Sequence, residues 1–241
     1  MVFDSLVVYT DEAPFWTCFL CESKTPSDDL RTWTLKLRSG ISFHDGTPLN
    51  AEAIQVNFET QKGDPLVGLA VKPFYPSENA TTIIDDLTIT FNLSDPDAWF
   101  PTSLTGQLGY VASPAWLAAA LEDPTLDQQP VGTGPFVFDS RSEDSITRFV
   151  RNENWWNGSA YLDAIEFLPV TDPAVRTSLL LEGELDGLAT TDIESIVRMT
   201  EAGNIQNFLD DDGEESFALI NSASAPFDDI RARQAITHAT P

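Results

Sequence analysis

Apolar and polar residues alternate strictly in two stretches of the chain, residues 32–38 and 86–93. A period of two places every second side chain on the same face, so each stretch predicts a half-buried β-strand. The apolar faces comprise Trp33, Leu35 and Leu37 in the first stretch and Leu87, Ile89, Phe91 and Leu93 in the second. Shorter runs bounded by turn residues predict further strands at residues 41–43, 136–138, 145–152, 164–170 and 215–221.

Helical spacing and capping residues predict several helices between these strands. Asn50 is a suitable N-cap for a helix over residues 51–62, in which Ile54 and Phe58 stand four positions apart. Ser113 and Asp172 each precede a proline, which is favoured at the first position of a helix. Further helices are expected at residues 115–122, 174–185, 190–203 and 228–239, with a Thr cap opening the third, and with Gly183 and Gly203 ending the second and third.

Strands and helices are interspersed along the chain without a repeat, and no low-complexity linker divides it. This mixture indicates an α/β or mixed α+β protein, in which helices and sheets share a core. The length of 241 residues is sufficient for one or two domains.

The net charge of the chain limits the classes of molecule that it is expected to bind. Lys and Arg number 13 against 38 Asp and Glu, which gives a formal net charge of −25. Such a field repels phosphate backbones and anionic lipids, so nucleic acid and membrane surfaces are not expected partners. Two interpretations of the acid excess stay open: a solubilising coat, or an acidic cleft that recruits cations.

The N-terminal residues 1–15 carry no basic leader, and Asp4 interrupts their short apolar run. We therefore expect no secretory signal within the chain as written. No stretch approaches the roughly 18 apolar residues that a membrane helix needs.

The cysteines, Cys18 and Cys21, are separated by two residues. A zinc site would need further ligands, and the chain offers only His44 and His238, far apart in sequence. A thioredoxin-like role would need a strand before the pair and a helix after it, whereas Pro14 precedes it and polar residues follow. We expect two structural cysteines, either buried or disulfide-linked, and no metal or other cofactor.

The stretch GISFHDGTPLN, residues 40–50, contains a histidine beside an aspartate. His44 and Asp45 alone form neither a catalytic triad nor a metal shell, because adjacent side chains on a turn diverge and no GxSxG elbow supplies a nucleophile. Asp45–Gly46 supplies a turn with positive φ, and Pro48 stiffens the approach to the Asn50 cap. We interpret this stretch as a structural turn.

Several stretches, in order along the chain, resemble the peptide/nickel class of extracellular solute-binding proteins, solute-binding family 5. The signature WTLKLRSGISFHDGTPLNAEAI at residues 33–54 carries most of the likeness, and Cys21-Glu22-Ser23 stands where the family usually has Ala-Glu-Ser. Trp155 occupies the place of a tyrosine in the family's Arg-Asn-x-x-Tyr-Trp turn. The other similar stretches are residues 130–138, 151–158, 167–188, with its Gly183-x-x-Asp186, and 226–239.

The resemblance implies a periplasmic-binding-protein-like type II fold of two lobes, of which this chain is mostly lobe I. We expect lobe I at residues 1–222, without its first strand, with an insert subdomain at about 30–129 and a return to the main sheet at 130–216. Residues 223–241 are then the hinge and the start of lobe II. Family members are longer, so the resemblance implies that the chain is a fragment.

The function that the resemblance implies is that of a receptor for an ABC importer, closing like a clamshell over a small solute. The solute is a peptide, a nickel chelate, a sugar or an opine, and the partners are the permease subunits. The parent protein is expected to be a monomer, periplasmic or a cell-surface lipoprotein, and no enzyme. Two alternatives stay open: a sensory or chaperone-like module on the same fold, and a carboxylate-based glycoside hydrolase, although the acids are scattered.

The resemblance also implies candidate ligand contacts. Gln107 and Tyr110 lie in a segment that faces the cleft in related receptors, and Trp99 is a candidate for stacking on a solute. Asn221 is a candidate polar contact at the cleft floor, or a brace for the hinge. The Trp155–Trp156 pair is interpreted as packing.

Overall fold

The computed structural model describes residues 1–13, 15–76, 78–142, 146–208 and 219–239, without the side chain of Ala70. The chain divides into two compact units, Met1–Pro169 (unit 1) and Val170–Pro241 (unit 2). All the β-strands of the described residues belong to unit 1, and unit 2 is helical there. The lobe, insert and hinge boundaries proposed from the resemblance stay a prediction.

A four-stranded antiparallel sheet forms the centre of unit 1, with the order β3-β4-β6-β5. Its strands are β3 (Cys21–Pro26), β4 (Thr32–Leu37), β5 (Thr81–Asp85) and β6 (Thr88–Asn92). Trp33 pairs with Phe91 and Leu35 with Ile89, so the two alternating stretches lie side by side with their apolar faces buried. Both strand predictions are confirmed. The edge strands β3 and β5 were not predicted, because polar residues occupy both of their faces.

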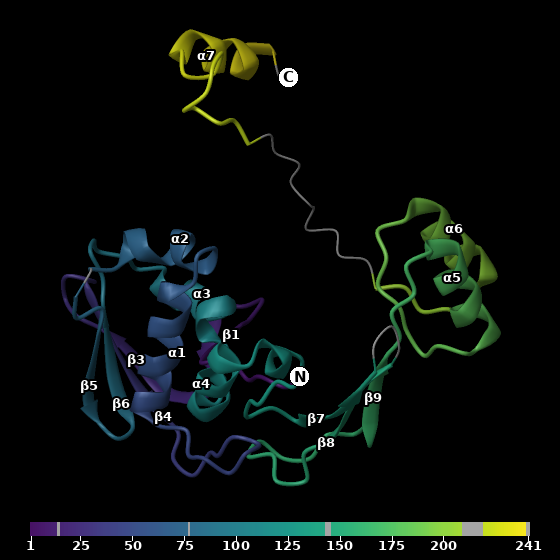
Figure 1. Ribbon diagram of the computed structural model, residues 1–241, viewed down its shortest axis with the longest axis horizontal. Helices are drawn as coiled ribbons and strands as arrows, with labels where there is room; N and C mark the ends of the chain where they lie inside the picture. The colour runs from purple at the N-terminus through teal and green to yellow at the C-terminus, as the bar shows by residue number, and fades with distance from the viewer. Residues whose placement is uncertain (14, 77, 143–145, 209–218, 240–241) are drawn as a thin grey trace. The chain divides into compact units, whose positions relative to one another are not determined.

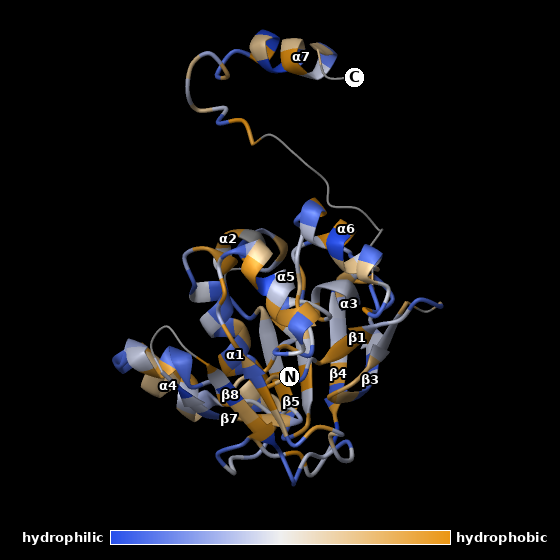
Figure 2. Cartoon of the chain, turned by 90° about the vertical axis from the view of Figure 1, so that its right-hand side faces the viewer, coloured by the Kyte–Doolittle hydropathy of each residue, from blue (hydrophilic) through white to orange (hydrophobic). Residues whose placement is uncertain are grey.

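Helix α1 (Ala51–Gly63) lies along this sheet, beside β5 and β6 (Figure 1). Its predicted cap is confirmed, since the Asn50 Oδ1 accepts a hydrogen bond from the Ala53 backbone N–H at 2.8 Å. Ile54 and Phe58 are buried in the same core cluster as β4 and β6. The helices carry both polar and apolar residues (Figure 2), as expected where one side of a helix is buried and the other meets water.

The second sheet of unit 1 has the order β7-β8-β9 and is also antiparallel. Its strands, β7 (Phe136–Arg141), β8 (Thr147–Arg151) and β9 (Ala164–Phe167), confirm three predicted strands. A short hairpin, β1 (Val7–Tyr9) with β2 (Trp16–Cys18), precedes both sheets in the chain. Cys18 is disulfide-bonded to Cys21, so β2 is joined covalently to the start of β3.

Residues 41–43 form no strand, contrary to the prediction. Ser42 makes only an isolated bridge with Pro48. The Phe43 N–H donates to the Thr47 carbonyl at 2.8 Å, so the stretch closes on its own turn instead of joining a neighbouring strand. Ile41 and Phe43 are nevertheless buried, which explains why the apolar pattern resembled that of a strand.

Short helical turns complete unit 1. They are α2 (Val67–Val71), η1 (Lys72–Phe74), α3 (Phe100–Ser103), η2 (Gln107–Gly109), α4 (Pro114–Glu122) and η3 (Pro124–Gln128). Helix α4 confirms a predicted helix, and the Ser113 Oγ accepts a hydrogen bond from the Trp116 N–H at 3.3 Å as its cap.

In unit 2, helix α5 (Pro173–Glu182) begins after Asp172 and ends at Gly183, whose φ of 82° is left-handed, as predicted. Helix α6 (Ile193–Ala202) ends at Gly203, also as predicted, but its cap is Asp192 rather than a threonine. The Asp192 Oδ2 accepts from the Ser195 N–H at 2.8 Å, because a carboxylate at that position reaches the free N–H groups of the first turn.

Helix α7 (Ile230–Ala239) confirms the last predicted helix. Of the strand predicted at residues 215–221, residues 215–218 lie outside the described part, and Leu219 to Asn221 are not in a strand. Within the described residues, no helix combines the length and the apolar character needed to cross a bilayer.

Candidate functional site

The His44–Asp45 turn is built into the scaffold of unit 1. The His44 Nδ1 accepts from the Gly132 N–H at 3.4 Å, and the Nε2 lies 2.9 Å from the Gly134 carbonyl. Burial lowers the pKa of His44, which favours the neutral ring that this pair of contacts requires. The Asp45 carboxylate instead accepts hydrogen bonds from the hydroxyl groups of Ser113 and Thr47. With Gly46 at φ 84°, the geometry is that of the predicted turn.

Unit 1 contains a cavity with a volume of about 660 Å³. It lies between residues 67–75, which form α2 and η1, and residues 93–108, which run from the end of β6 through α3 to η2. Its size falls within the range of small-molecule sites, roughly 300–1,000 Å³.

An aromatic cluster forms the inner wall of this cavity. Tyr75 and Phe100 line it, with ring centroids 6.5 Å apart, and both are buried. The ring centroids of Phe58 and Tyr75 lie 4.8 Å apart, and those of Phe91 and Phe100 lie 5.3 Å apart. The wall is therefore continuous with the core beneath it. Burial raises the pKa of Tyr75 above its ordinary value, and even at that ordinary value the hydroxyl is protonated at neutral pH. The wall is therefore aromatic and uncharged.

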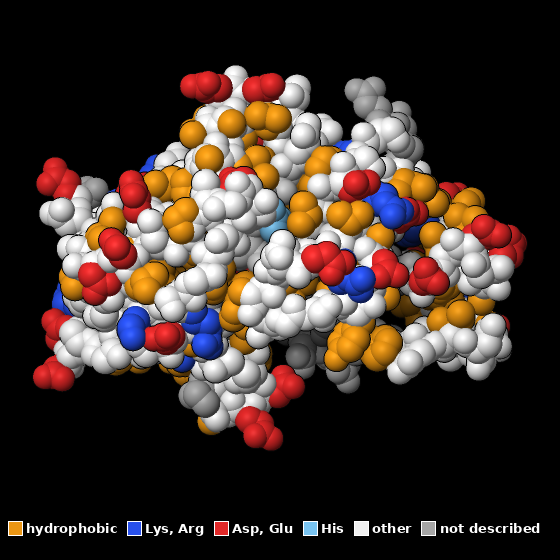
Figure 3. Space-filling view, turned by 90° about the horizontal axis from the view of Figure 1, so that it is seen from below, with side chains coloured by type: hydrophobic (Ala, Val, Ile, Leu, Met, Phe, Trp, Pro, Cys, Tyr) orange, Lys and Arg blue, Asp and Glu red, His pale blue; other side chains and the backbone are white. Residues whose placement is uncertain are grey.

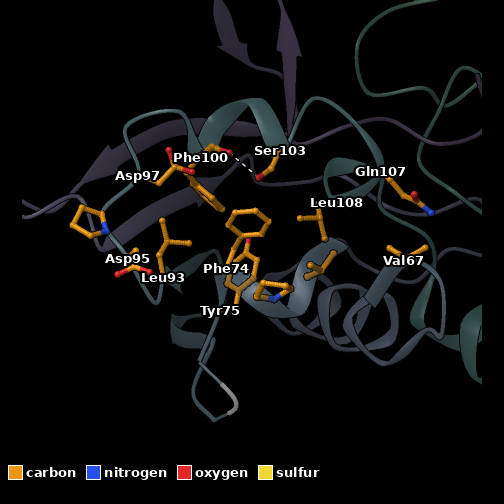
Figure 4. A pocket seen from close by; sticks show the side chains of 13 residues that line it. Val67, Phe74, Tyr75, Leu93, Asp95, Asp97, Phe100, Ser103, Gln107 and Leu108 are labelled. Carbon is orange, nitrogen blue, oxygen red and sulfur yellow. Dashed lines mark hydrogen bonds between the residues drawn. The ribbon is translucent and has the colours of Figure 1, made fainter. Parts of the chain in front are cut away.

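Polar groups stand at the two ends of the cavity. Asp95 and Asp97 lie at one end and Gln107 at the other, with Phe74 and Tyr75 between them (Figure 4). Asp97 Oδ1 accepts from the Trp99 N–H at 2.7 Å, which fixes its carboxylate at the start of α3. Asp95 lies 3.7 Å from Arg31, in an exposed ion pair. The arrangement suits an apolar ligand with polar or charged ends.

Of the candidate contacts from the sequence, the structure places Gln107 in this cavity and Trp99 outside its lining. The Trp99 side chain is 63% exposed and meets Trp16 of β2 edge to face, with centroids 5.2 Å apart. The two predicted residues therefore do not share one pocket.

Tyr110 also lies outside the lining of the cavity, although it follows η2 directly. Its ring is 47% exposed, and its carbonyl accepts from the Gln61 Nε2 at 3.4 Å. Asn221 belongs to unit 2, where its Nδ2 donates to the Ser224 Oγ at 3.2 Å and its Oδ1 accepts from the Ala223 N–H. This local turn fits the alternative of a brace within the segment that follows it. As ligand contacts, all four residues stay predictions.

Sequence reasoning missed the carboxylates Asp95 and Asp97 and the buried Tyr75. The segment SDPDAWFP, residues 94–101, offered a signal, because two acidic residues flank a proline directly after an alternating strand. That signal indicates a turn and does not by itself predict a cavity, which forms only when α2 and η1 pack opposite it.

Unit 2 contains a second cavity, of about 770 Å³, lined by residues between Leu180 and Phe208. In the part of the chain that the structure describes, no group of at least three His, Cys, Asp or Glu side chains is placed to hold a metal ion. Asp and Glu side chains are spread over the face shown in Figure 3, which fits a solubilising coat on that face. Trp156 contacts Phe19 at 5.1 Å and packs against the core, in agreement with a packing role.

Comparisons with known proteins agree along nearly the whole chain. The sequence profile described as bacterial extracellular solute-binding proteins, family 5 Middle, matches residues 18–241. Glutathione-binding protein GsiB of Escherichia coli O1:K1 is 30% identical over 221 residues, covering 91% of this chain and 43% of GsiB. Heme-binding protein A of Haemophilus influenzae is 30% identical over 240 residues, covering 91% of this chain and 44% of that protein.

Among solved structures, HbpA2 from Haemophilus parasuis is similar with a TM-score of 0.74 and 26% sequence identity. The similarity covers 99% of this chain and 51% of HbpA2. The chain thus spans about half the length of the relatives that it matches.

Proposed function

The chain belongs to family 5 of the bacterial extracellular solute-binding proteins, and from this premise we propose that it is part of a receptor that presents a small solute to an ABC importer. The match of the family profile to residues 18–241 carries the proposal. The fold is the type II periplasmic-binding-protein fold, of which the chain covers about half, as the sequence resemblance predicted.

The receptor works by closure of two lobes over the solute. A solute that contacts both lobes stabilises the closed form, and only as strongly as its contacts in the closed form exceed those in the open form. This chain supplies contacts from one lobe, with Gln107, Tyr110 and Trp99 as candidates and Asn221 near the hinge. Peptide-like solutes are the first class to test, since glutathione, a peptide, is the solute in the name of a relative.

The protein binds its solute without transforming it and does so outside the cytoplasmic membrane, in the periplasm or as a lipoprotein at the cell surface. Its relatives are named as binding proteins, which supports this assignment. A sensory module on the same fold is the alternative, and the partner distinguishes the two: permease and ATPase subunits for import, a kinase or chemoreceptor for sensing.

The test uses the protein encoded by the complete gene. Calorimetry with glutathione, a dipeptide set, heme and a nickel chelate is expected to give one class with a dissociation constant of about 1 μM or tighter, together with a smaller radius of gyration in solution scattering. Binding without compaction would contradict closure. Turnover of a chromogenic glycoside panel would contradict the assignment as a binding protein.

A further inference from the structure

The cavity beside η1 is formed by residues of unit 1. Its lining residues lie between Val67 and Leu108. They combine aromatic, aliphatic and carboxylate side chains, and this combination determines which ligand chemistry the cavity favours.

The walls of the cavity favour a ligand with an apolar body. Phe74 is 63% exposed and presents the accessible ring surface, whereas Tyr75 and Phe100 are buried in the wall. Leu108 adds an aliphatic surface. An exposed ring face attracts a cation that lies over it.

The charge at the rim selects for a cation. Among the described residues, no Lys, Arg or His lies within ion-pair distance of Asp97, and its carboxylate is fixed by the Trp99 N–H. Asp95 has Arg31 as a partner at 3.7 Å, but its side chain is 90% exposed, so that pair is weak. No cationic side chain lines the cavity. An anionic ligand would be repelled by the carboxylate of Asp97 there.

We propose that this cavity is a binding site for a small organic ammonium ion, with its apolar body against Phe74 and its charged nitrogen at Asp97. Gln107, at the opposite end, supplies a hydrogen-bond partner for a polar tail of the ligand. The site goes beyond the proposed receptor function in its ligand class, an organic ammonium ion, and in its main contacts, Asp97 and Phe74, which are not among the candidate solute contacts.

The experiment compares three probes of nearly equal size on the full chain: phenethylamine, phenethyl alcohol and 3-phenylpropionate. Calorimetry at low salt is expected to rank them as cation, neutral and anion, with the amine bound about tenfold tighter than the alcohol. In two-dimensional NMR spectra the amine is expected to shift backbone signals within residues 67–108. Equal affinity for the amine and the alcohol, shifts outside that segment, or no binding of the amine at millimolar concentration would overturn the proposal.

Two variants separate the site from the general acidity of the chain. Asp97→Asn keeps an acceptor for the Trp99 N–H, and it is expected to weaken amine binding about fivefold to tenfold while leaving the alcohol unchanged. Asp127→Asn removes the same charge from an exposed position in η3 and is expected to change neither. Equal losses in the two variants would show that only the overall field acts, and would contradict the site.

Discussion

The indole N–H of Trp156 donates a hydrogen bond of 2.8 Å to the carboxylate of Asp4, 152 residues earlier in the chain. The same Oδ2 atom accepts from the Trp155 indole and from the Thr133 hydroxyl, each at 3.2 Å. Asp4 is 5% exposed, so its charge is stabilised by donors rather than by water. The paired tryptophans thus fasten the N-terminal segment to the turn after β8, which is a structural function that their size alone did not reveal.

Replacing Asp4 is expected to destabilise unit 1 strongly. Asp4→Ala leaves three donors without their acceptor, which costs about 2–4 kcal/mol of the free energy of unfolding. Urea unfolding followed by tryptophan fluorescence measures the loss. Asp11→Ala, at an exposed position between β1 and β2, is the control and is expected to change the midpoint little. A loss no larger than that of the control would show that water reaches Asp4.

Replacing Gly132 by alanine is expected to destabilise unit 1 for a steric reason. A Cβ at this position would lie 2.2 Å from the Val2 carbonyl oxygen, so Gly132→Ala must push the N-terminal segment away from its loop. We expect a loss of about 1–3 kcal/mol in the free energy of unfolding, measured by urea unfolding.

Gly63 provides the matched control for this steric effect. It ends α1, and a Cβ there would have no atom within 4 Å. Gly63→Ala is expected to be neutral or slightly stabilising, by up to about 1 kcal/mol, because alanine favours the helix. Equal effects at the two glycines would mean that the N-terminal segment moves aside without cost.

Acid is expected to weaken unit 1 through His44. Burial sets the pKa of His44 in the folded state below its ordinary value of 6.5, so the unfolded state binds the proton first. The stabilisation is therefore complete above about pH 6.5 and is lost as the pH falls toward the lower folded pKa. The urea concentration at the unfolding midpoint is therefore expected to decrease as the pH is lowered from about 7.5 to about 5.5.

His44→Gln isolates this contribution. The variant is expected to lose about 1–2 kcal/mol at neutral pH with its hydrogen bonds, and to show a shallower decline between about pH 7 and pH 5.5. His238→Gln, in the exposed last turn of α7, is the control and is expected to keep the original slope. An unchanged slope in His44→Gln would assign the acid sensitivity to carboxylates instead.

The elements that sequence predicted well are those in which one local rule decides the structure. Trp33 and Leu35 alternate with polar residues because one face of β4 is buried, and Asn50 caps α1 because its side chain reaches its own helix. The edge strand β3 escaped notice, since polar residues such as Glu22 and Lys24 suit a strand that has a neighbour on one side only. β3 becomes a strand because it pairs with β4, and the residues of β3 alone do not reveal this pairing.

The candidate site was predicted less completely than the fold. Gln107 was found through resemblance, whereas Asp97 and Tyr75 belong to the cavity only because η1 packs opposite α3. A cavity forms where elements that are distant in sequence pack with a gap between them. The local pattern of apolar and polar residues does not record the distance between such elements. Trp99 was proposed as a stacking contact through the resemblance, and the structure places it outside the lining of this cavity, beside Trp16.

Trp99 is nevertheless expected to contact the solute in the protein encoded by the complete gene, and the comparison with Trp16 tests this. Trp99→Ala and Trp16→Ala both abolish the same edge-to-face pair, so each is expected to cost about 0.5–1.5 kcal/mol in the free energy of unfolding. A ring that also stacks on the solute contributes to affinity beyond this shared term. Solute affinity is therefore expected to fall at least about tenfold in Trp99→Ala and less than about threefold in Trp16→Ala, by calorimetry. Equal affinities in the two variants would leave Trp99 with a packing role alone, because the pair, rather than the exposed ring, would then account for both measurements.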